Sequence, residues 1–93
     1  MNKYELVIIV NSKLSKENEK KIITDMDNKI KEYGNILNKD DKGVKKLAYE
    51  INKNNEGHYI IYMFETDNKD ATPEIERFCR IRDEILKFII IKQ

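Results

Sequence analysis

Residues 43–52 read Gly-Val-Lys-Lys-Leu-Ala-Tyr-Glu-Ile-Asn, and residues 57–59 read Gly-His-Tyr. The first run leads from two lysines into a short apolar stretch, and polar residues then separate it from an aromatic-rich run that opens with glycine. This pattern predicts a β-hairpin with its loop at residues 53–57, between strands at 36–51 and 59–64. The hairpin is expected to place cationic and aromatic side chains on one sheet.

Hydrophobic spacing outside the hairpin predicts two helices and two more strands. Alternating β-branched residues indicate strands, and apolar residues repeating every 3.6 positions indicate helices. Ser15 is a good N-cap and Gly34 a stop for the first helix, while Thr72 and Pro73 suit the N-cap and first turn of the second. In order, the predicted elements are a strand at 4–10, a helix at 15–33, the strands at 36–51 and 59–64, a helix that begins at 72 and ends near 82, and a strand at 86–92.

The order β-α-β-β-α-β predicts an α+β fold, the ferredoxin-like split βαβ sandwich. Two right-handed crossovers then form a four-stranded antiparallel sheet, with the first and third strands central and the other two at the edges. Both helices cover one face, so the other face is either solvated or covered by a partner. The 93 residues are expected to form a single domain with no linker or tail.

Composition narrows the cellular setting. Charged residues make up 38% of the chain, yet the net charge is only +1, so overall charge neither favours nor excludes a nucleic-acid partner. A single cysteine rules out an internal disulfide and suits a reducing compartment. We see no secretory signal pattern and no apolar run near the roughly 20 residues that span a bilayer. A cytoplasmic domain is expected.

Candidates for catalysis or metal binding are few. His58, beside the hairpin glycine, is more typical of a solvated turn residue than of a general base, which needs positioned partners. Cys79 falls in the apolar stripe of the second helix and is more typical of a core residue than of a reactive thiol. Residues 40–41, both Asp, indicate a solvated bend rather than a calcium loop. We therefore expect no enzyme activity, no metal and no cofactor.

Adjacent and closely spaced basic residues are stronger candidates for a functional site, because they could contact phosphate. Lys45 and Lys46 must point to opposite faces of a strand, and protection of a sheet edge explains them as well as phosphate contact does. Arg80 and Arg82 lie at the end of the second helix, where the simple interpretation is a solvated end that complements the helix dipole. Arginine is scarce in this lysine-rich chain, which favours a contact specific to the guanidinium group.

Aromatic residues mark the hairpin strands. Tyr59 and Tyr62 have opposite parity, so a regular strand cannot turn both toward the helices. One of the two is therefore a candidate for the uncovered face, where a nucleic-acid base could stack.

Four pieces of the chain match a known pattern in the same order and at the same spacing. They are Lys3-Tyr4-Glu5, the run from Gly43 to Ile51 as Gly-x-basic-basic-Leu-Ala-Tyr-x-Ile, Gly57-x-Tyr59, and residues 80–87 as Arg-Ile-Arg-Asp-Glu-Ile-Leu-Lys. Nearly the whole chain thereby resembles the bacterial small-subunit ribosomal protein six family, the ribosomal protein bS6 family. Two features depart from the family pattern: Glu50 stands where proline is common, and the sequence ends at Gln93 without the charged tail of many members.

The resemblance implies a structural, RNA-binding role. The family pairs with the eighteenth small-subunit ribosomal protein, and this heterodimer docks on the central domain of small-subunit ribosomal RNA. The same partners, and a place in the cytoplasmic ribosome, are expected here. The phosphate-contacting residues are expected among Lys3, Lys45, Lys46, Arg80, Arg82, Lys87 and Lys92. Contacts to RNA or partner are expected from Tyr4, Tyr49 and Tyr59.

Other functions are compatible with the same fold, because a fold alone does not determine function. A small phosphatase would need an arginine-bearing phosphate loop after the first strand, and residues 11–14 contain no arginine. The alternative function is that of a small regulatory or dimerising domain, which would self-associate without affinity for RNA.

Overall fold

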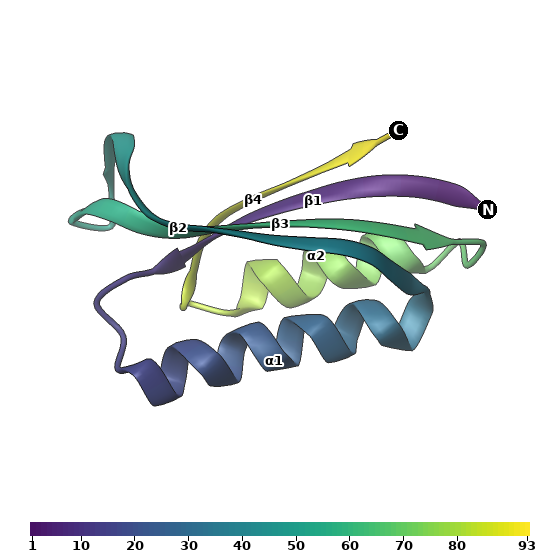
Figure 1. Cartoon of the computed structure of the whole chain (residues 1–93), viewed down its shortest axis with the longest axis horizontal. Coiled ribbons are helices and arrows are strands. Elements are labelled where there is room, and N and C mark those ends of the chain that lie inside the picture. The colour runs from purple at the N-terminus through teal and green to yellow at the C-terminus, as the bar shows by residue number, and fades with distance from the viewer.

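The computed structural model describes residues 1–93 and contains the predicted elements in the predicted order (Figure 1). They are β1 (Asn2–Asn11), α1 (Lys16–Tyr33), β2 (Asn35–Ile51), β3 (Asn54–Thr66), α2 (Ala71–Ile81) and β4 (Ile85–Lys92). Neighbouring strands are antiparallel throughout, and the order across the sheet is β2-β3-β1-β4. The ferredoxin-like α+β fold is confirmed, with β1 and β3 central.

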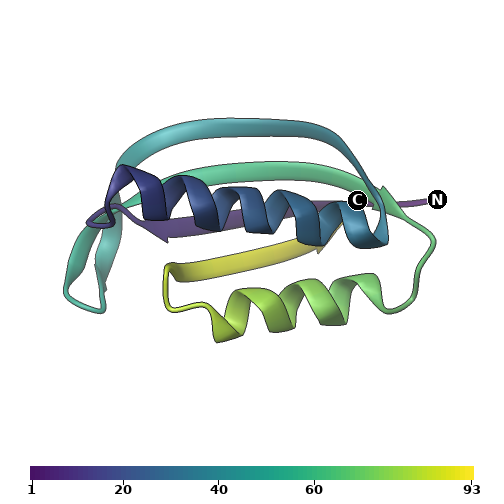
Figure 2. The same ribbon diagram turned by 90° about the horizontal axis from the view of Figure 1, so that it is seen from below.

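Both helices pack on one face of the sheet, the near face in Figure 2. Alternate residues of β1 and β3 point from the sheet toward the helices, and α1 packs against them with apolar residues spaced four apart. Each fully buried aliphatic or aromatic side chain stabilises the fold by roughly 1.5–3 kcal/mol. The core cluster consists of Leu6, Ile8, Val10, Ile22, Met26, Ile30, Ile60, Tyr62, Phe64, Ile75, Cys79 and Ile85. Neither helix is both long and apolar enough to cross a membrane.

The helix ends agree with the sequence prediction at α1 and differ at α2. Ser15 caps α1, since its hydroxyl accepts a hydrogen bond from the backbone N–H of Asn18 at 3.2 Å. The predicted cap at Thr72 is wrong, because α2 already begins at Ala71 with Asp70 at the cap position. The earlier start follows from Asn68, whose side-chain oxygen accepts the N–H of Asp70 at 2.8 Å.

The hairpin is longer than the sequence suggested, and its turn lies elsewhere. The predicted loop at 53–57 is wrong, because the chain reverses at Asn52 and Lys53. Their φ angles of 48° and 64° are both positive, as a type I′ turn requires. Ile51 pairs with Asn54 beside the turn, and pairing resumes at Lys46 and Glu56 after a register shift. Gly57 lies within β3, where a Cβ would collide with the side chain of Ile9 on β1. Glycine is therefore needed there for close approach and not for turning.

Candidate nucleic-acid and partner interface

The sheet face opposite the helices, called the open face below, is apolar along its centre. The strand register aligns Ile9 with Tyr59, and Val7 with Ile61 and Ile89, so these side chains share that face. The open face comprises Glu5, Val7, Ile9, Tyr59, Ile61, Met63, Lys87, Ile89 and Ile91. Exposed sheet faces are normally polar, yet Ile89 and Ile91 are 47% and 48% exposed. Such a patch is typical of a contact surface.

The tyrosines divide between the two faces. Tyr59 lies on the open face, whereas Tyr62 is fully buried under the helices and donates a hydrogen bond to Asp27 at 2.6 Å. Burial and this carboxylate both raise the pKa of Tyr62. Tyr4 stacks on Phe64 with ring centroids 5.4 Å apart, so it packs against the helix-covered core. Of the three tyrosines expected to make contacts, Tyr49 and Tyr59 are on the open side and Tyr4 is not.

The far end of the β2–β3 hairpin, called the hairpin arm and comprising residues 44–57, curls away from the helices (Figure 1). It carries Lys45 and Lys46, which lie on opposite sides of β2, and Tyr49, which is 62% exposed. Lys87 of β4 donates a hydrogen bond to the Tyr49 hydroxyl at 3.0 Å and lies 5.5 Å from its ring centroid. This contact ties the arm to the opposite edge strand.

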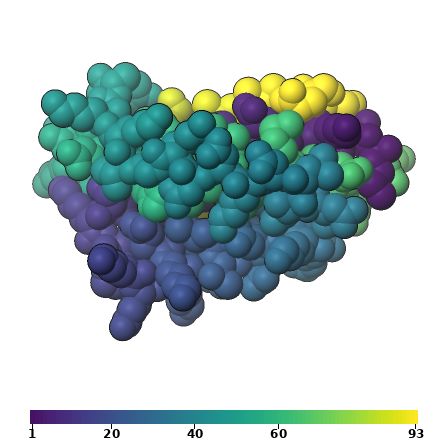
Figure 3. Space-filling model, in the orientation of Figure 1, coloured from purple at the N-terminus to yellow at the C-terminus, as the bar shows by residue number.

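The arm leaves a shallow hollow between itself and the open face. Figure 3 shows the arm in teal and β4 in yellow as two raised rims with a dip between them. The hollow measures about 90 Å³, enough for part of a side chain or for the edge of a base. Its lining consists of Ile9, Leu47, Ala48, Tyr49, Ile51, Tyr59 and Lys87.

Five of the seven basic residues expected to contact phosphate are exposed lysines without a carboxylate in ion-pair range. They are Lys3, Lys45, Lys46, Lys87 and Lys92. Three of them gather around the arm, whereas Lys3 and Lys92 lie at the opposite end of β1 and β4. An exposed, unpaired lysine offers its full charge to an incoming phosphate, and the arm carries such lysines together with the carboxylates of Glu50 and Glu56.

The two arginines of the expected set lie apart from the open face, beside the helices. Arg80 is 3.7 Å from Glu76 on the same helix, in an exposed ion pair of the kind that contributes little. Arg82 donates to Asp25 of α1 at 3.1 Å and covers the ring of Phe78 at 4.7 Å. Arg82 therefore joins the two helices, and its charge is partly neutralised within the fold.

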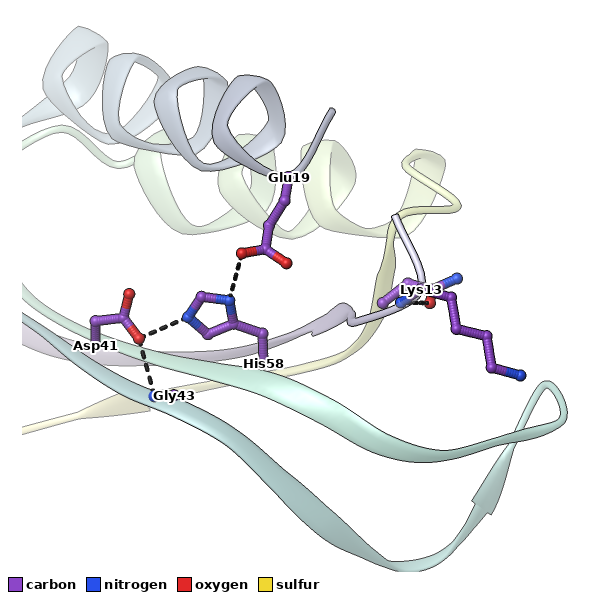
Figure 4. Close-up of polar contacts among 6 residues, drawn as sticks. Lys13, Glu19, Asp41, Gly43 and His58 are labelled. Carbon is purple, nitrogen blue, oxygen red and sulfur yellow. Dashed lines mark hydrogen bonds and ion pairs between the residues drawn. The ribbon is translucent and has the colours of Figure 1, made fainter. Parts of the chain in front are cut away.

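His58 is the functional candidate for which the sequence prediction was wrong. It is only 8% exposed, because the turn lies further along the hairpin and His58 falls inside β3 on the helix-covered face. Its two ring nitrogens meet Glu19 and Asp41 (Figure 4). The sequence feature that could have revealed this burial is the position of His58 in the strand alternation, where it has the same parity as the buried residues of β3. Cys79 is a core residue as expected, and burial raises the pKa of its thiol to about 12.

Comparison with known sequences points to a single family. A family model described as ribosomal protein S6 matches residues 3–92. The small ribosomal subunit protein bS6 of Alkaliphilus oremlandii is 39% identical over 92 residues, covering 99% of this chain and 97% of the relative. The bS6 protein of Thermoanaerobacter pseudethanolicus is 40% identical over 93 residues, with the same two coverages.

Solved structures agree with the sequence comparison. The crystal structure of 30S ribosomal protein S6 from Thermotoga maritima superposes with a TM-score of 0.92 at 29% identity, covering 99% of this chain and 87% of that one. A crystal structure of an Arabidopsis thaliana protein superposes with a TM-score of 0.55 at 17% identity, covering 100% of this chain and 93% of that one, which is a likeness of fold alone.

Proposed function

Because this chain belongs to the ribosomal protein S6 family and is a protein of the small ribosomal subunit, we propose that it docks on the central domain of small-subunit ribosomal RNA as a heterodimer with the eighteenth small-subunit protein. Membership of this family also confirms that the chain is not an enzyme. On this proposal the protein acts within the cytoplasmic ribosome. The observation that carries it is the apolar open face with unpaired lysines along its arm.

RNA binding is supported by the chemistry of the arm. Lysine ammonium groups contact phosphates as point charges, and tyrosine rings stack on unpaired bases. Lys87 lies against Tyr49 and Tyr59, and the register places Lys45 on the same face as Tyr59, so both chemistries meet in one place. Lys3 and Lys92 extend the same set along the sheet. We assign phosphate contact to these lysines and give Arg82 a structural role between the two helices, because Asp25 already holds its guanidinium group.

Partner binding is supported by the β4 edge. The sheet order leaves β4 with a neighbour on one side only, so backbone groups along the other side are free to pair with an added segment. Ile89 and Ile91 present their side chains beside that edge. An incoming apolar segment could therefore satisfy backbone groups and cover the open face together.

The test is equilibrium binding of the purified protein to a central-domain RNA fragment, with and without the eighteenth protein, across a salt series. If three to five cationic side chains neutralise phosphates, log K should fall against log salt with a slope of about −2 to −5, by counterion release. Binding should require the partner. A complex that is insensitive to salt would contradict the assigned lysines, and self-association without RNA affinity would favour the dimerising-domain alternative.

A further inference from the structure

The chain's single histidine lies at a junction of three elements, away from the open face. In Figure 4 its ring lies between two carboxylates. The Nδ1 atom of His58 is 2.8 Å from Oε1 of Glu19 in the first turn of α1, and Nε2 is 2.6 Å from Oδ1 of Asp41 on β2. None of these three residues belongs to the interface described above.

Counting protons fixes the charge state of this cluster. Ionised carboxylates only accept hydrogen bonds, and a neutral imidazole carries one N–H. Only the imidazolium form can donate from both ring nitrogens at once. Burial lowers the pKa of His58, but the hydrogen bonds to Asp41 and Glu19 outweigh it and raise that pKa above its ordinary value. In the reverse direction, burial raises the pKa of Asp41, and the bonds from His58 and the Gly43 N–H lower it.

No other charged side chain contacts the imidazole. On β1 the residue paired with His58 is the apolar Val10. Lys39 of β2 attracts Asp41 but forms its own ion pair with Asp27 at 2.9 Å. Lys13, in the loop before α1, directs its ammonium group to the Lys53 carbonyl at 3.1 Å. The two carboxylates therefore determine the protonation of His58.

Asp41 occupies the position from which the arm departs. Its carboxylate also accepts the backbone N–H of Gly43 at 2.9 Å, and the β2 register shifts between these two residues. Gly43 has a φ of 77°, a left-handed conformation that marks the bend. Whatever holds Asp41 in place consequently holds the base of the hairpin arm against α1.

We propose that His58 is a charged clamp: an imidazolium that ties the first turn of α1 to the β2 bend and so positions the hairpin arm. Loss of one proton to solvent leaves a ring lone pair facing a carboxylate, which breaks one of the two hydrogen bonds. The arm is then held less firmly. This property belongs to the free protein and does not depend on RNA binding or on a partner.

The test is an NMR titration of the imidazole in the full chain, which is unambiguous because there is one histidine. The midpoint should lie above the ordinary 6.5, and both ring nitrogens should carry a proton below it. Asp41→Asn and Glu19→Gln should each shift the midpoint downward. Asp40→Asn and Glu17→Gln remove one charge from the same strand or the same helical turn, and they should leave the midpoint nearly in place.

Amide exchange then reports on the arm. Protection factors of residues 44–57 in the wild-type protein should fall as the pH passes through the His58 midpoint, while those of α2 stay constant. A midpoint at or below 6.5, a midpoint that neither Asp41→Asn nor Glu19→Gln moves, or pH-independent protection of the arm would overturn the proposal. The wild-type titration alone decides the charge state even where a variant does not fold.

Discussion

Tyr59 and Tyr62 are the same residue type on one strand, three positions apart, in opposite environments. Tyr62 is fully buried with its hydroxyl on Asp27, whereas Tyr59 faces the open side. Tyr62→Phe should lower the free energy of unfolding by about 1.5 kcal/mol, because a hydrogen bond to a charged acceptor is lost. Tyr59→Phe, the matched control, should change it by less than about 0.5 kcal/mol. Urea unfolding measures both, and equal losses would contradict this assignment.

The His58 cluster makes stability depend on pH in two directions. The folded pKa of His58 is raised, so its contribution is complete below the ordinary value of 6.5 and is lost as the pH rises through the folded pKa. The folded pKa of Asp41 is lowered, so its contribution is complete above 3.8 and is lost as the pH falls through the folded pKa. Both contributions are present together between pH 3.8 and 6.5.

Comparing wild type with His58→Gln by urea unfolding across pH tests this dependence. The stability difference should be greatest inside that window and should become smaller at alkaline pH, where neutral His58 keeps only one of its two hydrogen bonds. A difference that grows as the pH rises would show that His58 is neutral in the folded protein.

Among the elements, the end of α2 is expected to contribute to stability, and the hairpin arm is expected to contribute to RNA binding. Arg82→Gln removes the contacts to Asp25 and Phe78 and should cost about 1 kcal/mol of stability without altering the salt slope of RNA binding. Changing Lys45 and Lys46 together to Gln should leave stability within about 0.5 kcal/mol and make the slope shallower by about 2. A shallower slope for Arg82→Gln would instead restore the phosphate contact expected from the sequence.

The strands and helices themselves could be predicted because their signals are local. Alternation in β1 and the Ser15 cap depend on neighbours within a few residues. The turn was misplaced because Asn52-Lys53 holds no glycine, and the glycine further along serves the packing of Ile9. Parity showed that Tyr59 and Tyr62 must separate, but which one is buried depends on helices contributed by distant segments.

At the scale of the whole molecule, the sequence could not predict which side chains pair across the fold. Arg82 and Asp25 are 57 positions apart, and Glu19 and His58 are 39 apart. These pairs exist only after both crossovers bring the helices onto one face. The first pair holds Arg82 within the fold, whereas the exposed lysines of the arm and the sheet have no carboxylate partner.

The central claim, that the open face and the hairpin arm form the binding surface, is tested most directly by NMR mapping. Isotope-labelled protein is titrated first with the eighteenth protein and then with the central-domain RNA fragment. We predict that amide signals of β4 near Ile89 and Ile91 shift with the partner, and those of Lys45, Lys46 and Tyr49 shift with the RNA. Signals on the outer face of α1, such as Lys20, should stay in place. Shifts confined to the two helices, with the open face unaffected, would contradict the account.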